Sequence, residues 1–156
     1  MTASTSHNDN TMPTTSLAKL LHARTDADLV SCFEAFLVLR PHLTLERFIE
    51  QVRRQEAQGY RIVAWLDGSQ VVSAAGYRVS EFLAWGKVLY IDDLTTLPSS
   101  RQHGHAGALL DWLLDHARAE GCDAVHLDSG HQRHAAHRLY LNKGFVLSSH
   151  HFALAL

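Results

Sequence analysis

Apolar side chains recur at helical spacing in two stretches of the first third of the chain. In the first stretch, Thr25 and Asp28 have the spacing of a capping box that begins a helix, and Pro41 cannot continue it. The second predicted helix starts at Thr44 and ends near Gly59, a natural C-cap residue. The apolar faces of the two helices are formed by Leu29, Cys32, Phe33, Phe36, Leu37, Leu45, Phe48, Ile49 and Val52.

The pattern then changes to one typical of strands. Two runs rich in β-branched and aromatic residues lie within residues 60–79 and flank Asp67-Gly68, a dipeptide that favours a hairpin turn. A further strand is predicted over residues 88–97, immediately before Pro98.

Helices and strands alternate in the remainder. The apolar spacing predicts an amphipathic helix from near Gly104 to Gly121, a short strand over residues 122–128 and a helix over residues 131–142. One or two strands are expected over residues 145–156. Two leading helices, a hairpin and then alternating strands and helices indicate a single α/β domain with a mixed sheet covered by helices.

The composition of the chain argues against two classes of partner, nucleic acids and membranes. The formal net charge is −2, so no broad basic surface is present to attract nucleic acid. No apolar run approaches the ~18 residues of a membrane span, and no membrane partner is expected. Cys32 and Cys122 belong to no CxxC or Cys/His ligand spacing, and are expected to be reduced core residues in a cytoplasmic protein.

The first sixteen residues differ in composition from the rest. They are mainly Ser, Thr and Asn, with hardly an apolar side chain. Such a segment cannot bury enough surface to offset the entropy of ordering, and it lacks the apolar stretch of a signal peptide. We expect a disordered tail over residues 1–16 and one domain over residues 17–156.

Small residues gather where the helix near Gly104 begins, with Ala106, Gly107 and Ala108 close behind. A helix start exposes unpaired N–H groups and the positive end of the helix dipole, and small side chains let a phosphate reach them. Close packing in a tight turn explains the same residues equally well. The spacing is neither GxGxxG nor that of a P-loop.

At this point the sequence resembles the GNAT superfamily of acyl-CoA-dependent N-acetyltransferases. Residues 101–106, RQHGHA, match the R/Q-x-x-G-x-G/A motif that the family carries between its fourth strand and third helix. Residues 135–145, AAHRLYLNKGF, resemble the family's helix ending in Tyr before a Gly-Phe turn. The resemblance implies a single-domain α/β GNAT-like fold, with a central mixed, mostly antiparallel sheet flanked by helices.

The resemblance also implies the activity. A GNAT enzyme moves an acetyl group from acetyl-CoA to a primary amine of a small molecule or peptide, which attacks the thioester directly. In the family, backbone N–H groups of the glycine-containing loop hold the pyrophosphate, and an N–H of the fourth strand contacts the oxyanion. The matching positions here are Leu94, Thr95, Thr96, Arg101, Gln102, His103, Gly104, His105, Ala106 and Gly107.

One position departs from the family pattern. Many members carry Asn seven residues before the family's tyrosine, where it contacts the pantetheine arm of the cofactor. This chain has Arg133 there. Arg133 is therefore kept as a candidate cofactor contact, although it could equally reach a substrate carboxylate or solvent.

Three residues are candidates for proton transfer. Tyr140 matches the family's tyrosine that protonates the departing thiolate, and a phenol with a pKa of ~10 stays protonated at neutral pH. Asp92 and Asp93 are candidate bases for the amine. Neighbours on a strand point to opposite faces, so at most one of the two carboxylates is expected to face the cleft. The simpler alternatives are that Asp92 and Asp93 are solvated or capping carboxylates and that Tyr140 is a core residue.

Histidine is unusually frequent, with 12 residues, and His131, His134 and His137 follow at three-residue steps. No carboxylate or cysteine set completes a metal site beside them, and no metal is expected. A histidine-rich metal-binding module and a non-catalytic acyl-CoA sensor are the competing functions. Tyr140 favours the enzyme, because a sensor would not need it. The chain is also a candidate homodimer.

Removing residues 1–16 is expected to leave the domain intact, because the segment has little apolar surface to pack. A chain starting at Leu17 should keep the melting temperature of the full chain and its affinity for acetyl-CoA. Thermal unfolding and calorimetric titration measure the two quantities. A drop of several degrees in the melting temperature would show that the segment packs on the domain.

Overall fold

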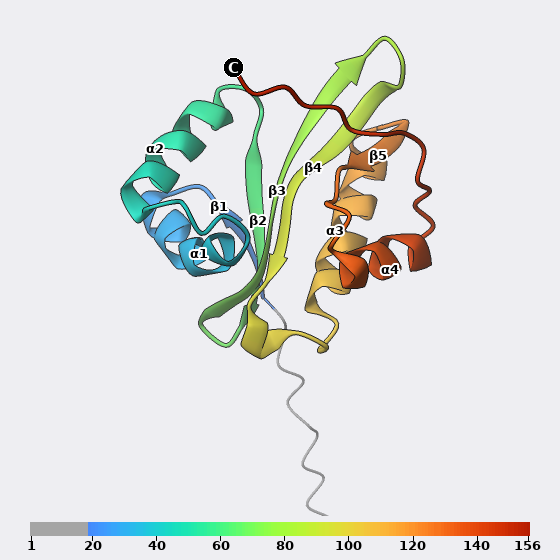
Figure 1. Ribbon diagram of the computed structural model, residues 1–156. Helices are drawn as coiled ribbons and strands as arrows, with labels where there is room; N and C mark the ends of the chain where they lie inside the picture. The colour runs from blue at the N-terminus through green and yellow to red at the C-terminus, as the bar shows by residue number, and fades with distance from the viewer. Residues whose placement is uncertain (1–18) are drawn as a thin grey trace, which may run out of the picture.

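A computed structural model describes residues 19–156, which fold around one five-stranded sheet (Figure 1). The expected tail over residues 1–16 lies outside the described residues. Strands β1 to β4 pair antiparallel in chain order, and β5 pairs parallel with β4. The elements are β1 Lys19–Ala23, α1 Asp26–Leu39, α2 Leu45–Glu56, β2 Arg61–Asp67, β3 Gln70–Phe82, β4 Gly86–Thr96, the short 3-10 helix Pro98–Ser100, α3 His105–Ala119, β5 Ala124–Leu127 and α4 His134–Asn142.

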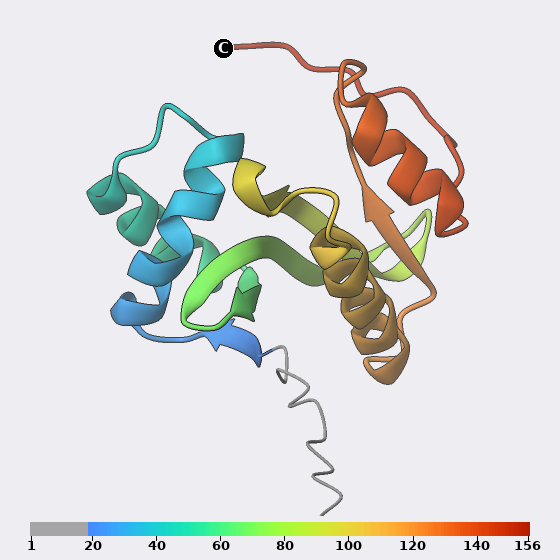
Figure 2. The ribbon, with the colours of Figure 1, turned by 90° about the horizontal axis from the view of Figure 1, so that it is seen from below.

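The predicted fold class is confirmed: a mixed, mostly antiparallel sheet lies between helices. α1 and α2 lie on one side of the sheet, and α3 and α4 lie on the other (Figures 1 and 2). Phe36 and Phe48 centre one apolar cluster, between the sheet and the first pair of helices. Leu109, Leu110 and Leu113 of α3 centre the second cluster.

Local signals in the sequence account for the helix ends. The Thr25 hydroxyl accepts the Asp28 N–H at 3.2 Å, and the Asp28 carboxylate accepts the Thr25 N–H at 2.8 Å, which closes the predicted capping box. Gly59 and Gly121, which follow α2 and α3, have φ of +89° and +69°. A residue with a Cβ would be strained in either conformation.

The structure differs from the sequence-based prediction at both ends of the described chain. Strand β1 was not predicted, because its five residues KLLHA lack a clear alternation and pair only through β2. The last helix begins at His134, three residues later than predicted. Residues 145–156 form no strand, because nothing in residues 19–156 pairs with their backbone.

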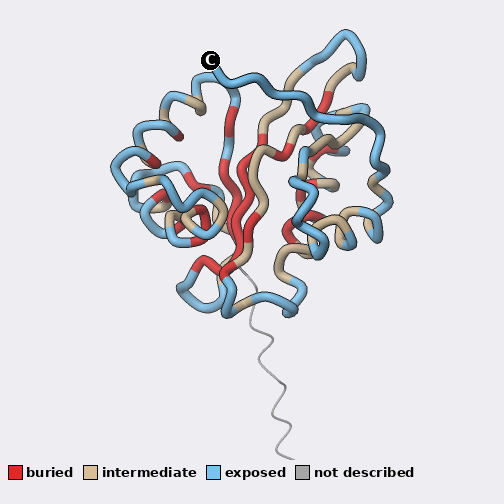
Figure 3. The backbone as a smooth tube through the Cα atoms, viewed as in Figure 1, coloured by how far each residue is buried: buried red, intermediate tan, exposed pale blue. Residues whose placement is uncertain are grey.

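Burial is uneven across the molecule. Buried residues concentrate in β2, β3 and β4 and on the inner faces of α1 and α3, whereas α4 has no buried residue (Figure 3). No helix of the described residues is long and apolar enough to cross a bilayer.

Candidate active site

A bulge in β4 brings its two carboxylates to the same side of the sheet. The β3–β4 register passes from Gly76 opposite Asp93 to Tyr77 opposite Ile91, which leaves Asp92 without a partner. An extra residue of this kind breaks the alternation of a strand. Asp92 and Asp93 therefore both line one cavity of about 410 Å³ between β4, α1 and α2. The expectation that at most one faces the cleft was wrong for this reason.

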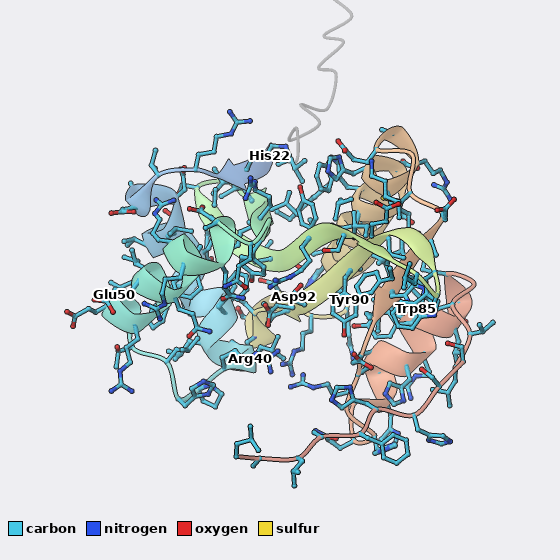
Figure 4. The ribbon with its side chains drawn as sticks, turned by 90° about the horizontal axis from the view of Figure 1, so that it is seen from above. His22, Arg40, Glu50, Trp85, Tyr90 and Asp92 are labelled. Carbon is cyan, nitrogen blue, oxygen red and sulfur yellow. The ribbon has the colours of Figure 1, made fainter. Side chains whose placement is uncertain are left out.

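Each carboxylate is held by its own arginine. Asp92 accepts hydrogen bonds from Nε and Nη2 of Arg78, a residue of β3, with the shortest at 2.6 Å. Asp93 accepts from Nε and Nη2 of Arg40, at the end of α1, at 3.1 and 2.8 Å. The two Asp side chains are only 21% and 13% exposed, whereas Arg40 remains 44% exposed. Figure 4 shows Arg40 and Asp92 between the first two helices and the sheet.

Tyr60 supplies a third polar contact in this cavity. Its hydroxyl donates to Asp93 Oδ2 at 2.8 Å, and the Arg78 guanidinium lies 5.5 Å from its ring centroid. Burial raises the pKa of Tyr60 well above its usual value, and the nearby Asp93 charge raises it further. The phenol is therefore protonated and remains a donor.

Gly76 makes room for that tyrosine. A Cβ at Gly76 would lie 1.8 Å from the Tyr60 hydroxyl oxygen, so only glycine lets the ring lie across β3. Tyr60, Arg40 and Arg78 were not predicted from the sequence. A glycine inside a strand marks a close approach, and Gly76 is the one signal that points to such a neighbour.

Beyond Ile91, strand β4 loses its neighbour on one side. The parallel pairing with β5 runs from Val88 opposite Ala124 to Ile91 opposite Leu127 and stops there. In residues 19–156, no strand pairs with that edge of residues 92–96. The predicted contacts Leu94, Thr95 and Thr96 lie on this open edge. Thr95 is fixed in place, because its hydroxyl donates to the Ala35 carbonyl and its carbonyl accepts the Ser73 hydroxyl.

The loop of residues 101–107 follows the same end of β4. Gln102 and Gly104 have φ of +64° and +79°, and Gly104 is the N-cap of α3 without a side-chain cap. None of the N–H groups of residues 102–107 donates to a backbone acceptor or capping side chain within residues 19–156. The position of a Cβ on Gly104 is open. Free donors at a helix start suit a pyrophosphate, so the residues present fit coenzyme A.

The remaining loop residues are arranged around these donors. The rings of His103 and His105 stack with centroids 5.9 Å apart. Arg101 is exposed, while Ala106 and Gly107 are half-buried in the first turn of α3. A Cβ on Gly107 would lie 3.8 Å from Leu139, so α4 packs beside the first turn of α3.

Tyr140 is carried by α4, next to Leu139. Its ring packs against Phe145, with centroids 5.9 Å apart, and against the apolar cluster under α3. Burial raises the pKa of the Tyr140 phenol, and the charge of Arg133, the N-cap of α4, partly opposes this effect. Tyr140 lines neither the cavity at Asp92 and Asp93 nor the groove beside β5.

The histidines of residues 19–156 do not assemble into a ligand set. Within residues 19–156, no group of three or more His, Cys, Asp or Glu side chains is arranged to hold a metal ion. His134 and His137 contact each other edge to face, with ring centroids 6.3 Å apart.

Comparison with known proteins identifies the family. Residues 24–145 match the model of the acetyltransferase (GNAT) family. The chain belongs to this family. The resemblance seen in the sequence is thus confirmed, and the chain is an N-acetyltransferase that transfers an acetyl group to an amine.

Two curated relatives and one solved structure illustrate the similarity. The uncharacterized N-acetyltransferase YhdJ of Bacillus subtilis is 32% identical over 116 residues, which cover 73% of this chain and 82% of the relative. Aminoalkylphosphonate N-acetyltransferase of Salmonella typhimurium is 35% identical over 66 residues, 42% of this chain and 43% of the relative. The aminoglycoside N-acetyltransferase AAC(6')-Iy in complex with CoA superposes with a TM-score of 0.74 at 14% identity, over 89% of this chain and 95% of that structure.

Substituting Gly104 by valine is expected to weaken acetyl-CoA binding at least tenfold, or ~1.4 kcal/mol, because the branched side chain would stand where we expect the phosphates to approach the loop. Isothermal titration calorimetry measures the effect. Arg101→Ala should cost less, because the backbone donors remain.

Gly121→Val is the matched control for backbone strain. Gly121 lies at the other end of α3, also has positive φ, and also has open space at its Cβ. It should lose stability like Gly104→Val but keep its affinity. Equal affinities for the two folded variants would contradict the assignment of the loop.

Proposed function

We propose that residues 101–107 bind the pyrophosphate of acetyl-CoA and that the open edge of β4 at residues 94–96 receives the thioester. One observation carries this proposal: the free N–H groups of the loop and the divergence of β4 from β5 occur at the same end of β4. Backbone donors that are already in place can stabilise an oxyanion without reorganisation. Acetyl-CoA is a substrate here, and the protein contributes mainly main-chain contacts to it.

The acceptor amine approaches from the cavity lined by Asp92 and Asp93. The two carboxylates are the acids nearest the open edge of β4, and one of them takes the proton of the attacking amine, directly or through water. The two carboxylates differ in their arginine partners. Arg78, the partner of Asp92, is fixed within β3, whereas Arg40, the partner of Asp93, lies at a helix end and is 44% exposed.

The acceptor is a small molecule rather than a peptide. The cavity of about 410 Å³ is bounded by α1, α2 and β4, which suits a compact ligand. By their names, two similar proteins act on aminoalkylphosphonates and aminoglycosides, which are small amines. The free thiols of Cys32 and Cys122 support the proposed cytoplasmic location.

Tyr140 is the proposed proton donor to the departing thiolate. Its raised pKa keeps the phenol protonated across the neutral range. Arg133 lies close enough to influence that pKa, and we propose that it contacts the phosphate or pantetheine part of the substrate.

Consumption of acetyl-CoA in the presence of a panel of amines tests the function. The panel contains aminoalkylphosphonates, aminoglycosides, polyamines, amino acids and peptide N-termini. Turnover with a small amine supports the proposal. Turnover confined to peptides contradicts the proposed acceptor class, and tight acetyl-CoA binding without turnover on any amine favours the sensor.

Tyr140→Phe is expected to lower kcat by ~10²–10⁴-fold while acetyl-CoA affinity stays within a few-fold, because only the donated proton is lost. Steady-state kinetics and calorimetry measure both. Tyr77→Phe is the control, since Tyr77 packs in the same apolar cluster and its hydroxyl contacts His116 instead. A kcat within about threefold of the parent in a variant that binds acetyl-CoA would remove Tyr140 from the mechanism.

Substitution of the two carboxylates separates the base from its neighbour. The variant that lacks the base, either Asp92→Asn or Asp93→Asn, should lose at least about a hundredfold in kcat. The other should change mainly KM. Asp111→Asn, which alters an exposed ion pair with Lys143, should change neither. If both site variants keep a kcat within about threefold of the parent, neither carboxylate is the base.

A further inference from the structure

Arg40 lines the cavity at Asp92 and Asp93, and its guanidinium group is only partly used by the protein. Nε and Nη2 both donate to a single oxygen, Oδ1 of Asp93, at 3.1 and 2.8 Å. Nη2 also lies 3.5 Å from the Asp92 carbonyl oxygen (Figure 4), whereas Nη1 donates to no acceptor within residues 19–156. A guanidinium group presents N–H donors along more than one edge of a planar fork. Arg40 can therefore hold Asp93 along one edge and a second anion along another.

The second arginine of the site is not available in this way. Arg78 donates to both carboxylate oxygens of Asp92, and its side chain is only 22% exposed. Its guanidinium group lies 5.5 Å from the ring centroid of Tyr60, and the residue does not line the cavity. Arg40 is therefore the cation of this ion-pair cluster that a ligand in the cavity can reach.

The charges of the site cancel before any ligand enters. Asp92 and Asp93 are paired with Arg78 and Arg40, and the described residues that line the cavity include no other carboxylate. A polyamine would bring two or more positive charges to carboxylates that are already paired, and nothing would offset the lost hydration. A zwitterion adds no net charge, because its ammonium faces the carboxylates and its anion faces Arg40. The balance of charge favours an acceptor amine that also carries an acidic group.

The direct contact between Arg40 and Asp93 limits the length of such a ligand. Nη2 of Arg40 lies 2.8 Å from Oδ1 of Asp93, so two ligand groups bound to these side chains must lie next to each other. A ligand meets this condition when its amine and its acidic group are on the same carbon atom or on neighbouring ones. A longer chain would have to fold back on itself, which costs conformational entropy on binding.

The remaining lining residues suit a compact ligand with a polar end. Phe36 and Phe48 are buried and give the cavity an apolar side. Gln51 and Gln55 lie one turn apart on α2, and His42 lies in the connection between α1 and α2. Amide and imidazole N–H groups can donate to the oxygens of an acidic group, as Arg40 can.

We propose that the acceptor is a small amine with a carboxylate or phosphonate on the same or the neighbouring carbon, and that Arg40 binds this acidic group. The inference rests on the proposed function, because it takes the cavity at Asp92 and Asp93 as the acceptor site. During transfer the acceptor nitrogen forms a bond to the acetyl carbon, the C–S bond breaks, and the amine proton passes to one of the two carboxylates. The acidic group forms and breaks no bond. Its contact with Arg40 orients the nitrogen and determines which amines are accepted.

Matched pairs of amines test the substrate class in steady-state kinetics at saturating acetyl-CoA. Alanine, β-alanine and 1-aminoethylphosphonate carry the acidic group, and alaninamide, β-alaninamide and ethylamine are their neutral partners. For at least one pair, kcat/KM of the acid-bearing amine should exceed that of its partner at least about a hundredfold. 6-Aminohexanoate, in which the two groups are far apart, and the diamine putrescine should be as poor as the neutral amines.

The outcomes separate this inference from the proposed function. Turnover of neutral amines or diamines that equals or exceeds turnover of the acid-bearing amines would leave the proposed function standing and overturn the inference. The absence of turnover with every amine would overturn both. A preference for the carboxylates over the phosphonate, or the reverse, identifies the acidic group and supports the inference in either case.

Arg40→Gln tests the residue that makes the contact. It should lower the ratio of kcat/KM for the acid-bearing amine to kcat/KM for its neutral partner at least about tenfold. Any effect transmitted through Asp93 is common to both amines and cancels in this ratio. Arg40→Lys keeps the charge without the planar fork and should retain part of the preference.

Arg54→Gln is the matched control, because Arg54 is exposed on α2 and lines no part of the cavity. It should leave the ratio unchanged. An equal loss of kcat/KM for both amines in Arg40→Gln would mean that Arg40 acts only by holding Asp93, and the inference would be wrong.

Discussion

The geometry of the whole site depends on one extra residue in β4. Asp92 has no partner on β3, and the pairing of β4 with β5 ends at the preceding residue, Ile91. A bulge bends a strand and increases its twist, which turns β4 away from β5. The same residue therefore opens the edge of the strand toward the loop of residues 101–107 and rotates both carboxylates toward α1 and α2. Without the bulge, β5 could continue along β4, and one carboxylate would point to the other side of the sheet.

A bulge that gathers two carboxylates also creates an electrostatic problem. Two neighbouring negative charges, each less than a quarter exposed, repel each other and lose hydration. Arg78 and Arg40 offset this cost from two different elements, and Tyr60 adds a neutral donor. Removing either arginine would leave a partly buried charge without its partner, a larger penalty than the pair's net contribution to stability. The helix α1 is thereby tied to β4 by an ion pair as well as by its apolar face.

The features that could be predicted from the sequence are those that depend on residues close together along the chain. The capping box at Thr25, the glycine-ended helices and the hairpin at Gly68 are local, and so is the loop motif that revealed the family. The bulge is a property of the register between two strands. It was missed because we assumed that side chains alternate strictly between the two faces of β4. Arg40 and Tyr60 lie 53 and 33 residues from Asp93, and no pattern in the chain links them. Residues 145–156, where a strand was expected, have the residue types of a strand. A strand also needs a neighbouring strand to pair with, and a single sequence does not show whether one is available.

The two halves of the site are built from different chemical groups. The proposed acetyl-CoA half consists of main-chain N–H groups of a loop and a strand edge, which almost any small side chains can present. The proposed acceptor half consists of side chains that α1, α2, β3 and β4 bring together, and a change in any of them alters the cavity. Because β4 contributes residues to both proposed halves, the side chains of the acceptor half can vary without moving the main-chain groups of the acetyl-CoA half.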